Sequence, residues 1–176
     1  KLSLCENGSG ARAYSEAIAL YLSFIISRLS DFNSSVCGWI PVVQATRNTF
    51  ARQGIPMSWD FAELNPFSKW LASFDAALKK IVNAQKISLP SDYKNIKPGV
   101  TLQDDAASSK NLKQFIVSTD PPYYDNIGYA DLSDFFYVWL RYSLKDFFPE
   151  LFKTLSVPKS QELVAAPYRH GGKDNA

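Results

Sequence analysis

Residues 117–126 read Val-Ser-Thr-Asp-Pro-Pro-Tyr-Tyr-Asp-Asn, and this stretch carries the clearest indication of the fold. The residues before it, Gln114–Val117, are mostly apolar and end in two β-branched side chains, which is typical of a short strand. Pro121 and Pro122 end this strand because a proline has no amide hydrogen for a sheet hydrogen bond. Pro121 also restricts Asp120 to extended backbone. The sequence therefore predicts that the Asp120 carboxylate lies at the carboxyl end of a strand, where open α/β sheets bind ligands.

The side chains of this stretch suit the binding of a planar base through its exocyclic amine. The Asp120 carboxylate and the Pro121 carbonyl oxygen can each accept one N–H of an amino group. The Tyr123 ring can stack on the base, a contact worth roughly 1–3 kcal/mol. Two acceptors on its hydrogens favour a pyramidal nitrogen, whose lone pair can attack an electrophilic methyl group. This is preorganised electrostatic assistance to the reaction.

The tetrapeptide Asp120–Tyr123 resembles motif IV, the DPPY motif, of the amino-group DNA methyltransferases, whose acidic form goes mainly with N6-adenine methylation. Further blocks are similar, in order, to a group of large adenine-specific DNA methylases: Arg47–Phe50, Trp59–Glu63, Asn65–Ser68, Tyr124–Asn126, Tyr129–Leu140 and Tyr168–Gly172. The resemblance implies methyl transfer from S-adenosylmethionine to the N6 amine of a flipped adenine in DNA. The catalytic residues it implies are Asp120, Pro121, Pro122 and Tyr123, and the substrate-binding residues are Tyr124 and Asn126.

A cofactor contact is expected just after residues 100–103, which read as a second strand. An acidic residue and an alanine after a strand resemble the methyltransferase motif that accepts a hydrogen bond from the cofactor's adenine amine. By this resemblance Asp105 and Ala106 bind S-adenosylmethionine, and Asp104 is the alternative acid. No Gly-x-Gly-x-x-Gly run occurs in the chain. Since the methyltransferases it resembles carry a glycine-rich cofactor turn upstream of the central motif, the resemblance implies that this turn lies before Lys1, in a longer enzyme of which this chain is an inner part.

The expected fold class is α/β, as a partial Rossmann-like S-adenosylmethionine-dependent methyltransferase fold. Residues 1–99 form its helix-rich half and residues 100–176 its strand–DPPY–helix half, and both belong to one domain. Apolar residues at helical spacing predict helices over residues 14–32, 66–84 and 132–148. Asn65 and Asp131 are the expected N-caps of the second and third helices, and Pro149 is expected to end the third. Residues 57–61 read as a short strand, and residues 39–41 as an interruption of regular structure.

Charge, cysteine content and the longest apolar run give further expectations about partners and sites. The net charge of +2 neither demands nor excludes a nucleic-acid partner. Cys5 and Cys37 form no Cys-x-x-Cys pair, so no metal site is predicted, and both are expected to be reduced thiols in a cytoplasmic protein. His170, the only histidine, is interpreted as a solvent or phosphate contact. The longest apolar run, Ala17–Ile26, is too short to span a bilayer.

Three alternatives remain for particular residues. Arg47 and Arg52 flank Phe50, so this segment is either a surface turn, which the sequence favours, or a nucleic-acid contact in which Phe50 stacks on a base. The amine held by the central motif could instead belong to RNA or to a protein glutamine. Residues 121–124 also fit the Pro-Pro-x-Tyr pattern that WW domains bind, which is typical of a non-catalytic interaction module.

Overall fold

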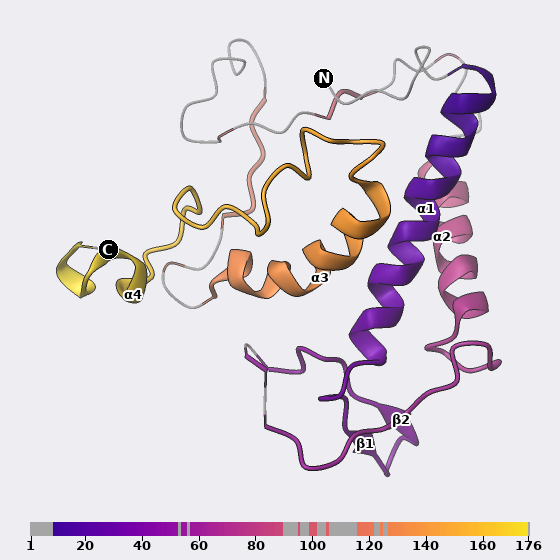
Figure 1. Cartoon of the computed structure of the whole chain (residues 1–176), viewed down its shortest axis with the longest axis horizontal. Coiled ribbons are helices and arrows are strands. Elements are labelled where there is room, and N and C mark those ends of the chain that lie inside the picture. Colours follow the sequence, from indigo (N-terminus) through magenta and orange to yellow (C-terminus); the bar gives the residue numbers. More distant parts are fainter. Residues whose placement is uncertain are drawn as a thin grey trace.

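The structure is a computed structural model, and it describes residues 9–52, 54–55, 57–89, 95, 99–101, 105, 116–121, 124 and 127–175 (Figure 1). The helices are α1 (Gly10–Phe32), α2 (Phe74–Ser88), α3 (Tyr129–Leu144), the short α4 (Pro167–His170) and the 3-10 helix η3 (Lys173–Asn175). The strands are β1 (Trp39–Ile40) and β2 (Ala45–Thr46). Within the described residues, the fold is therefore mainly helical with one small antiparallel sheet.

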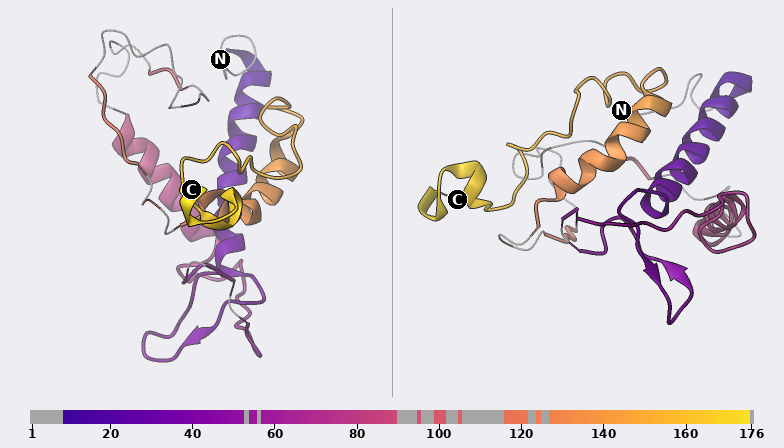
Figure 2. Two further views of the ribbon diagram at one scale, coloured as in Figure 1. Left: turned by 90° about the vertical axis from the view of Figure 1, so that its left-hand side faces the viewer. Right: turned by 60° about the horizontal axis from the view of Figure 1, so that its bottom comes forward.

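Helix α1 is the centre of the described fold. It packs against both α2 and α3, which lie on different sides of it (Figure 2). The helical spacing of its apolar residues predicted this helix, and the prediction is confirmed, including the end at Phe32. Ala13 and Ile25 are buried, and the Asn33 side-chain amide donates to the Leu29 carbonyl oxygen at 2.8 Å, which satisfies one of the last helical carbonyls. None of the described helices combines the length and apolar character needed to cross a bilayer.

Helix α2 begins later than the sequence predicted. Its N-cap is Ser73, whose buried Oγ accepts a hydrogen bond from the Ala76 amide at 3.2 Å. Asn65 caps a separate turn instead, because its Oδ1 accepts from the Phe67 amide at 2.9 Å. Phe67 and Trp70 are 87% and 74% exposed, so they do not belong to the buried face of this helix. The expected start at residue 66 was wrong because a buried serine supplies the cap further along the chain.

The segment after α1 folds into a hairpin where the sequence suggested only interruption. Trp39 pairs with Thr46 and Ile40 with Ala45, in antiparallel register. Pro41 does not break the ladder because it lies outside the strand, at the start of the turn that ends at Gln44. Residues 57–61, by contrast, do not form the strand that was expected for them.

Phe50 connects this hairpin region to α3. Its ring lies 5.4 Å from the Phe135 ring and 5.7 Å from the Phe136 ring, measured between centroids. Phe135 and Phe136 also contact each other edge to face. Phe50 therefore packs against α3, while Arg47 and Arg52 on either side of it are exposed, as the favoured surface turn predicts. Thr49 beside it is buried, and its Oγ1 donates to the Asp31 carbonyl oxygen at 2.9 Å, which ties the segment to the end of α1.

Helix α3 was predicted correctly in kind and only approximately in its ends. It begins at Tyr129 with Gly128 as N-cap, so Asp131 lies in the first turn and is not the cap. It ends at Leu144, before Pro149. The chain then turns back along α3. Arg141 holds this returning segment, since its Nε donates to the carbonyl oxygens of Phe152 and Thr154 at 3.1 and 3.0 Å. The following residues, 157–170, which we call the C-terminal segment, run beside the first turns of this helix (Figure 1).

The strands expected around the central motif are not formed by the described residues. Ile116 and Val117 lie in irregular structure, and Ile116 is fully exposed. Val100 and Thr101 are irregular as well, whereas residues 102–104 and 106–115 lie outside the described residues. A strand is stable only when its backbone pairs with a neighbour, and the described part of the chain places no partner beside either segment. Asp120 is therefore not presented by the end of a described strand, as had been expected.

Candidate functional site

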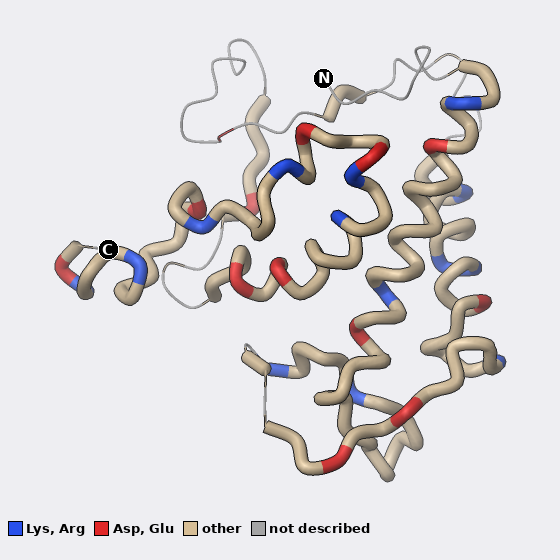
Figure 3. The backbone as a smooth tube through the Cα atoms, viewed as in Figure 1, with Lys and Arg blue, Asp and Glu red and all other residues tan. Residues whose placement is uncertain are grey.

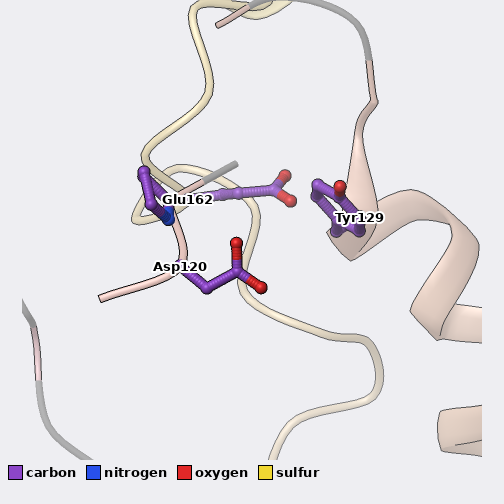
Figure 4. Close-up of a pocket in the computed structure, with 4 residues that line it drawn as sticks. Asp120, Tyr129 and Glu162 are labelled. Carbon is purple, nitrogen blue, oxygen red and sulfur yellow. The ribbon is translucent and has the colours of Figure 1, made fainter. Parts of the chain in front are cut away.

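A pocket of about 370 Å³ lies at the start of α3, and it is lined by Asp120, Pro121, Tyr129 and Glu162 (Figure 4). These residues come from three segments: the central motif, the first position of α3 and the C-terminal segment. The carboxylate of Glu162 extends toward the Tyr129 ring, and the carboxylate of Asp120 faces the same space (Figure 4). The pocket thus combines two carboxylates, a proline and an aromatic ring.

The structure brings together only some of the residues that the sequence singled out. Asp120 and Pro121 line the pocket. Tyr124 is exposed, but its carbonyl oxygen accepts a hydrogen bond from the Ala165 amide at 2.8 Å, which attaches the motif to the C-terminal segment. Asp105 is exposed and does not line the pocket. Asp104, Ala106, Pro122, Tyr123, Asp125 and Asn126 lie outside the described residues.

No protein-family model matches this chain, and it matches no curated protein and no solved structure. What the pocket can do chemically therefore depends on its own residues and their contacts. Within the part of the chain that the structure describes, no group of three or more His, Cys, Asp and Glu residues is placed to hold a metal ion. His170 is exposed at the end of α4.

Glu162 caps α3 from a distance. The first amides of a helix have no partner within the helix, and Gly128 as N-cap has no side chain to supply one. The Glu162 Oε1 accepts a hydrogen bond from the Ala130 amide at 2.9 Å, across 32 positions of sequence. A negative charge at this end of the helix is also favoured by the helix dipole. Glu162 is therefore held in place on one side by the backbone next to Tyr129.

Arg169 holds Glu162 on its other side. Its Nη1 donates to the Glu162 Oε2 at 2.5 Å, and its Nη2 donates to the Asp131 Oδ2 at 2.6 Å. The Tyr168 hydroxyl donates to the same Asp131 oxygen at 2.8 Å. The Arg169 and Glu162 side chains are only 11% and 13% exposed, so water competes little for this ion pair. We call Asp131, Glu162, Tyr168 and Arg169 the clamp.

The clamp stabilises the charged forms of Asp131 and Arg169. The hydrogen bond from Arg169, followed by that from Tyr168, holds the pKa of Asp131 below its usual range. The hydrogen bond that Arg169 donates to Glu162, followed by the one that it donates to Asp131, raises the pKa of Arg169. The hydrogen bond to Asp131 raises the pKa of Tyr168. At neutral pH the guanidinium therefore lies between two carboxylates, and the tyrosine stays protonated.

A second ion pair attaches the C-terminal segment one turn further along α3. Lys159 Nζ donates to the Asp134 Oδ2 at 2.5 Å, and the Val157 amide donates to the Asp134 Oδ1 at 2.8 Å. Burial opposes the charged form of Asp134 most strongly, but these two hydrogen bonds outweigh it and lower the pKa. Acidic residues on the first turns of α3 thus face basic residues of the segment beside it (Figure 3).

Two of the pocket residues could not be assigned from the sequence. Glu162 lies 32 positions from its partner Ala130, in a stretch with no motif, so no local pattern indicated it. Tyr129 was part of a block that resembles the methylases, but no role was inferred for it. Its local signal was a position shortly after the central motif and close to the predicted start of a helix.

Proposed function

We propose that this chain belongs to an S-adenosylmethionine-dependent DNA methyltransferase and that its pocket holds the N6 amine of a flipped adenine. The proposed fold of the parent domain is Rossmann-like, with the described helices and hairpin as one part of it. The single observation that carries the proposal is that Asp120 and Pro121, the two acceptors of the motif, line one pocket.

The electrostatics of the pocket support an amine-bearing ligand. Asp120 is exposed to the pocket and takes part in none of the ion pairs between described residues, so its oxygens can accept from a ligand. Glu162 adds a second negative charge on the other wall. A phosphate group would be repelled by these two carboxylates, whereas an amino group supplies hydrogen-bond donors. A nucleotide is therefore expected to enter with its base inside and its phosphates outside.

The size of the pocket and its aromatic wall also fit a single base. A volume of about 370 Å³ is near the lower end of the range of about 300–1,000 Å³ for small-molecule pockets. The Tyr129 ring offers a stacking surface, which is worth roughly 1–3 kcal/mol per base. In the proposed role, Asp120 and the Pro121 carbonyl oxygen orient the amine. Tyr129 stacks on the base, as is also proposed for Tyr123.

The described residues do not form a complete site for the cofactor. Asp105, which the resemblance assigns to S-adenosylmethionine, is not among the residues that line the pocket. S-adenosylmethionine supplies an electrophilic methyl group when it is bound in an enzyme of this class. The role proposed for the residues of this chain is limited to holding and orienting the acceptor amine.

Replacement of Asp120 in the full-length protein tests this function. We expect Asp120→Asn to lower the transfer of labelled methyl groups to DNA by at least about 100-fold, because it removes a charged acceptor from the reacting amine. The variant should fold normally, with a free energy of unfolding within about 0.5 kcal/mol of wild type, since Asp120 is exposed. Unlabelled RNA added in excess should leave incorporation into DNA unchanged.

Asp146→Asn is the matched control, because Asp146 is also exposed but follows the opposite end of α3. It should retain wild-type methyl transfer. Wild-type rates in Asp120→Asn would refute the role of this carboxylate. Competition by RNA, or the absence of any methyl transfer by wild type, would refute the proposed substrate or reaction.

A further inference from the structure

Arg169 connects two walls of the pocket that belong to different segments. One wall is Glu162 of the C-terminal segment, and the other is the first turn of α3, where Tyr129 lines the pocket and Asp131 follows two positions later. Arg169 contacts Glu162 with one terminal nitrogen and Asp131 with the other, and its Nη1 also donates to the Lys159 carbonyl oxygen at 3.2 Å. All these contacts use the planar guanidinium.

The guanidinium is itself held in one orientation. Its carbon lies 5.5 Å from the centre of the Tyr168 ring, a cation–π contact, and the Tyr168 hydroxyl bonds to the Asp131 oxygen that Arg169 also contacts. The Arg169 amide donates to the Ala166 carbonyl oxygen at 2.9 Å, which fixes the backbone from which the side chain extends. A lysine could not replace this arrangement, because its ammonium is a point charge without a rigid fork.

The contacts pass from Arg169 to the wall of the pocket through one further bond. Arg169 holds the Glu162 Oε2, and the Glu162 Oε1 accepts from Ala130, the residue directly after Tyr129. A change at Arg169 therefore releases Glu162 and with it the only bond that the Ala130 amide makes among the described residues. Both the position of the carboxylate and that of the tyrosine relative to Asp120 depend on this chain of contacts.

We propose that Arg169 is a positioning residue, which sets the separation between Glu162 and Tyr129 and so fits the pocket to the acceptor amine. This inference rests on the proposed function, and it assigns Arg169 no contact with the substrate. The inference predicts that methyl transfer to the DNA acceptor is impaired when the two-pronged guanidinium is lost, even if the positive charge is kept.

Arg169→Lys and Arg169→Gln in the full-length protein separate these effects. We expect both to raise the KM for the DNA acceptor by at least about tenfold, because small misplacements in a site are costly, and to leave the KM for S-adenosylmethionine unchanged. A purely structural role would lower kcat through the folded fraction, with both KM values unchanged. Wild-type kinetics in Arg169→Lys would also overturn the inference, since charge alone would then suffice.

A double-variant cycle tests whether Arg169 acts through Glu162. If it does, Arg169→Gln should have little further effect in a Glu162→Gln background, so that the double variant resembles the single Glu162→Gln variant within about threefold. Multiplicative effects of the two substitutions would show independent roles and overturn the proposed chain of contacts.

The exchange rate of the Ala130 amide hydrogen provides a readout that does not need activity. Arg169→Gln should raise this rate at least tenfold, because the amide loses its fixed acceptor, whereas Lys79→Gln, which removes an exposed ion pair on α2, should not change it. An unchanged rate would overturn the inference. If wild type transfers no methyl group but the rate rises, the proposed function fails and the positioning of the pocket wall by Arg169 stands.

Discussion

A Cβ atom on Gly128 would lie 2.7 Å from the hydroxyl oxygen of Tyr168. It would also lie 2.9 Å from the Asp131 Oδ2 and 3.3 Å from the Arg169 Nη2. The backbone of Gly128 has an ordinary φ of −79°, so a side chain there would meet the close approach of the clamp and no conformational barrier. The clamp therefore closes directly over the residue that precedes α3.

Gly128→Ala is expected to destabilise the protein by about 1–3 kcal/mol, because the added methyl group forces apart side chains that hold one another. Gly128→Ser should be similarly destabilised although serine is a good N-cap, which separates the steric effect from the capping preference. Urea unfolding measures both. Gly38→Ala is the control, since a Cβ there meets no atom within 4 Å, and it should leave stability unchanged or raise it by up to about 1 kcal/mol.

Phe50→Ala should lower the free energy of unfolding by about 2–3 kcal/mol, somewhat less than for a fully buried phenylalanine, because Phe50 is half-buried. The loss comes from its contacts with Phe135 and Phe136. Phe67→Ala, at an 87% exposed position, should change stability by no more than about 0.5 kcal/mol. Normal stability of Phe50→Ala together with weakened DNA binding would instead support a base-stacking role.

Ser73→Ala should cost about 1 kcal/mol of stability, because it removes the acceptor for the Ala76 amide at the start of α2. Asn65→Ala removes a hydrogen bond in an exposed turn and should cost less. Thermal unfolding of both variants compares the two caps. A larger loss for Asn65→Ala would place the start of α2 where the sequence pattern alone put it.

The clamp should make stability depend on acidic pH. Because the folded state lowers the pKa of Asp131, its contribution is fully present above the pKa of about 3.9 in the unfolded chain and is lost as the pH falls through the lower folded value. Asp131→Asn should therefore be less stable than wild type at pH 7, and the free energies of unfolding of the two proteins should converge below pH 4. Urea unfolding between pH 7 and pH 2.5 measures the difference; a difference that is constant over this range would contradict the assignment.

Helix spacing and the central motif were readable from the sequence. The apolar spacing of α1 and α3 identified both helices because a periodic spacing is a local property, although Tyr14, Ile18, Tyr21 and Leu22 of α1 remain exposed. The start of α2 could not be read in this way, because the choice between Asn65 and Ser73 as cap depends on which serine or asparagine becomes buried. The described residues directly before Asp120, 116–119, form no strand for a related reason, since strand formation depends on a partner.

By itself, the sequence determined two long helices and a motif in which Asp120 and Pro121 stand side by side as acceptors, because adjacent residues and helical periods need no knowledge of the rest of the chain. Only the tertiary structure decided that Glu162 and Tyr129 complete the pocket and that Arg169 links Glu162 to Asp131. These partners lie up to 38 positions apart. Their contacts exist because the chain after α3 turns back along the helix and brings opposite charges together, a path that no local pattern encodes.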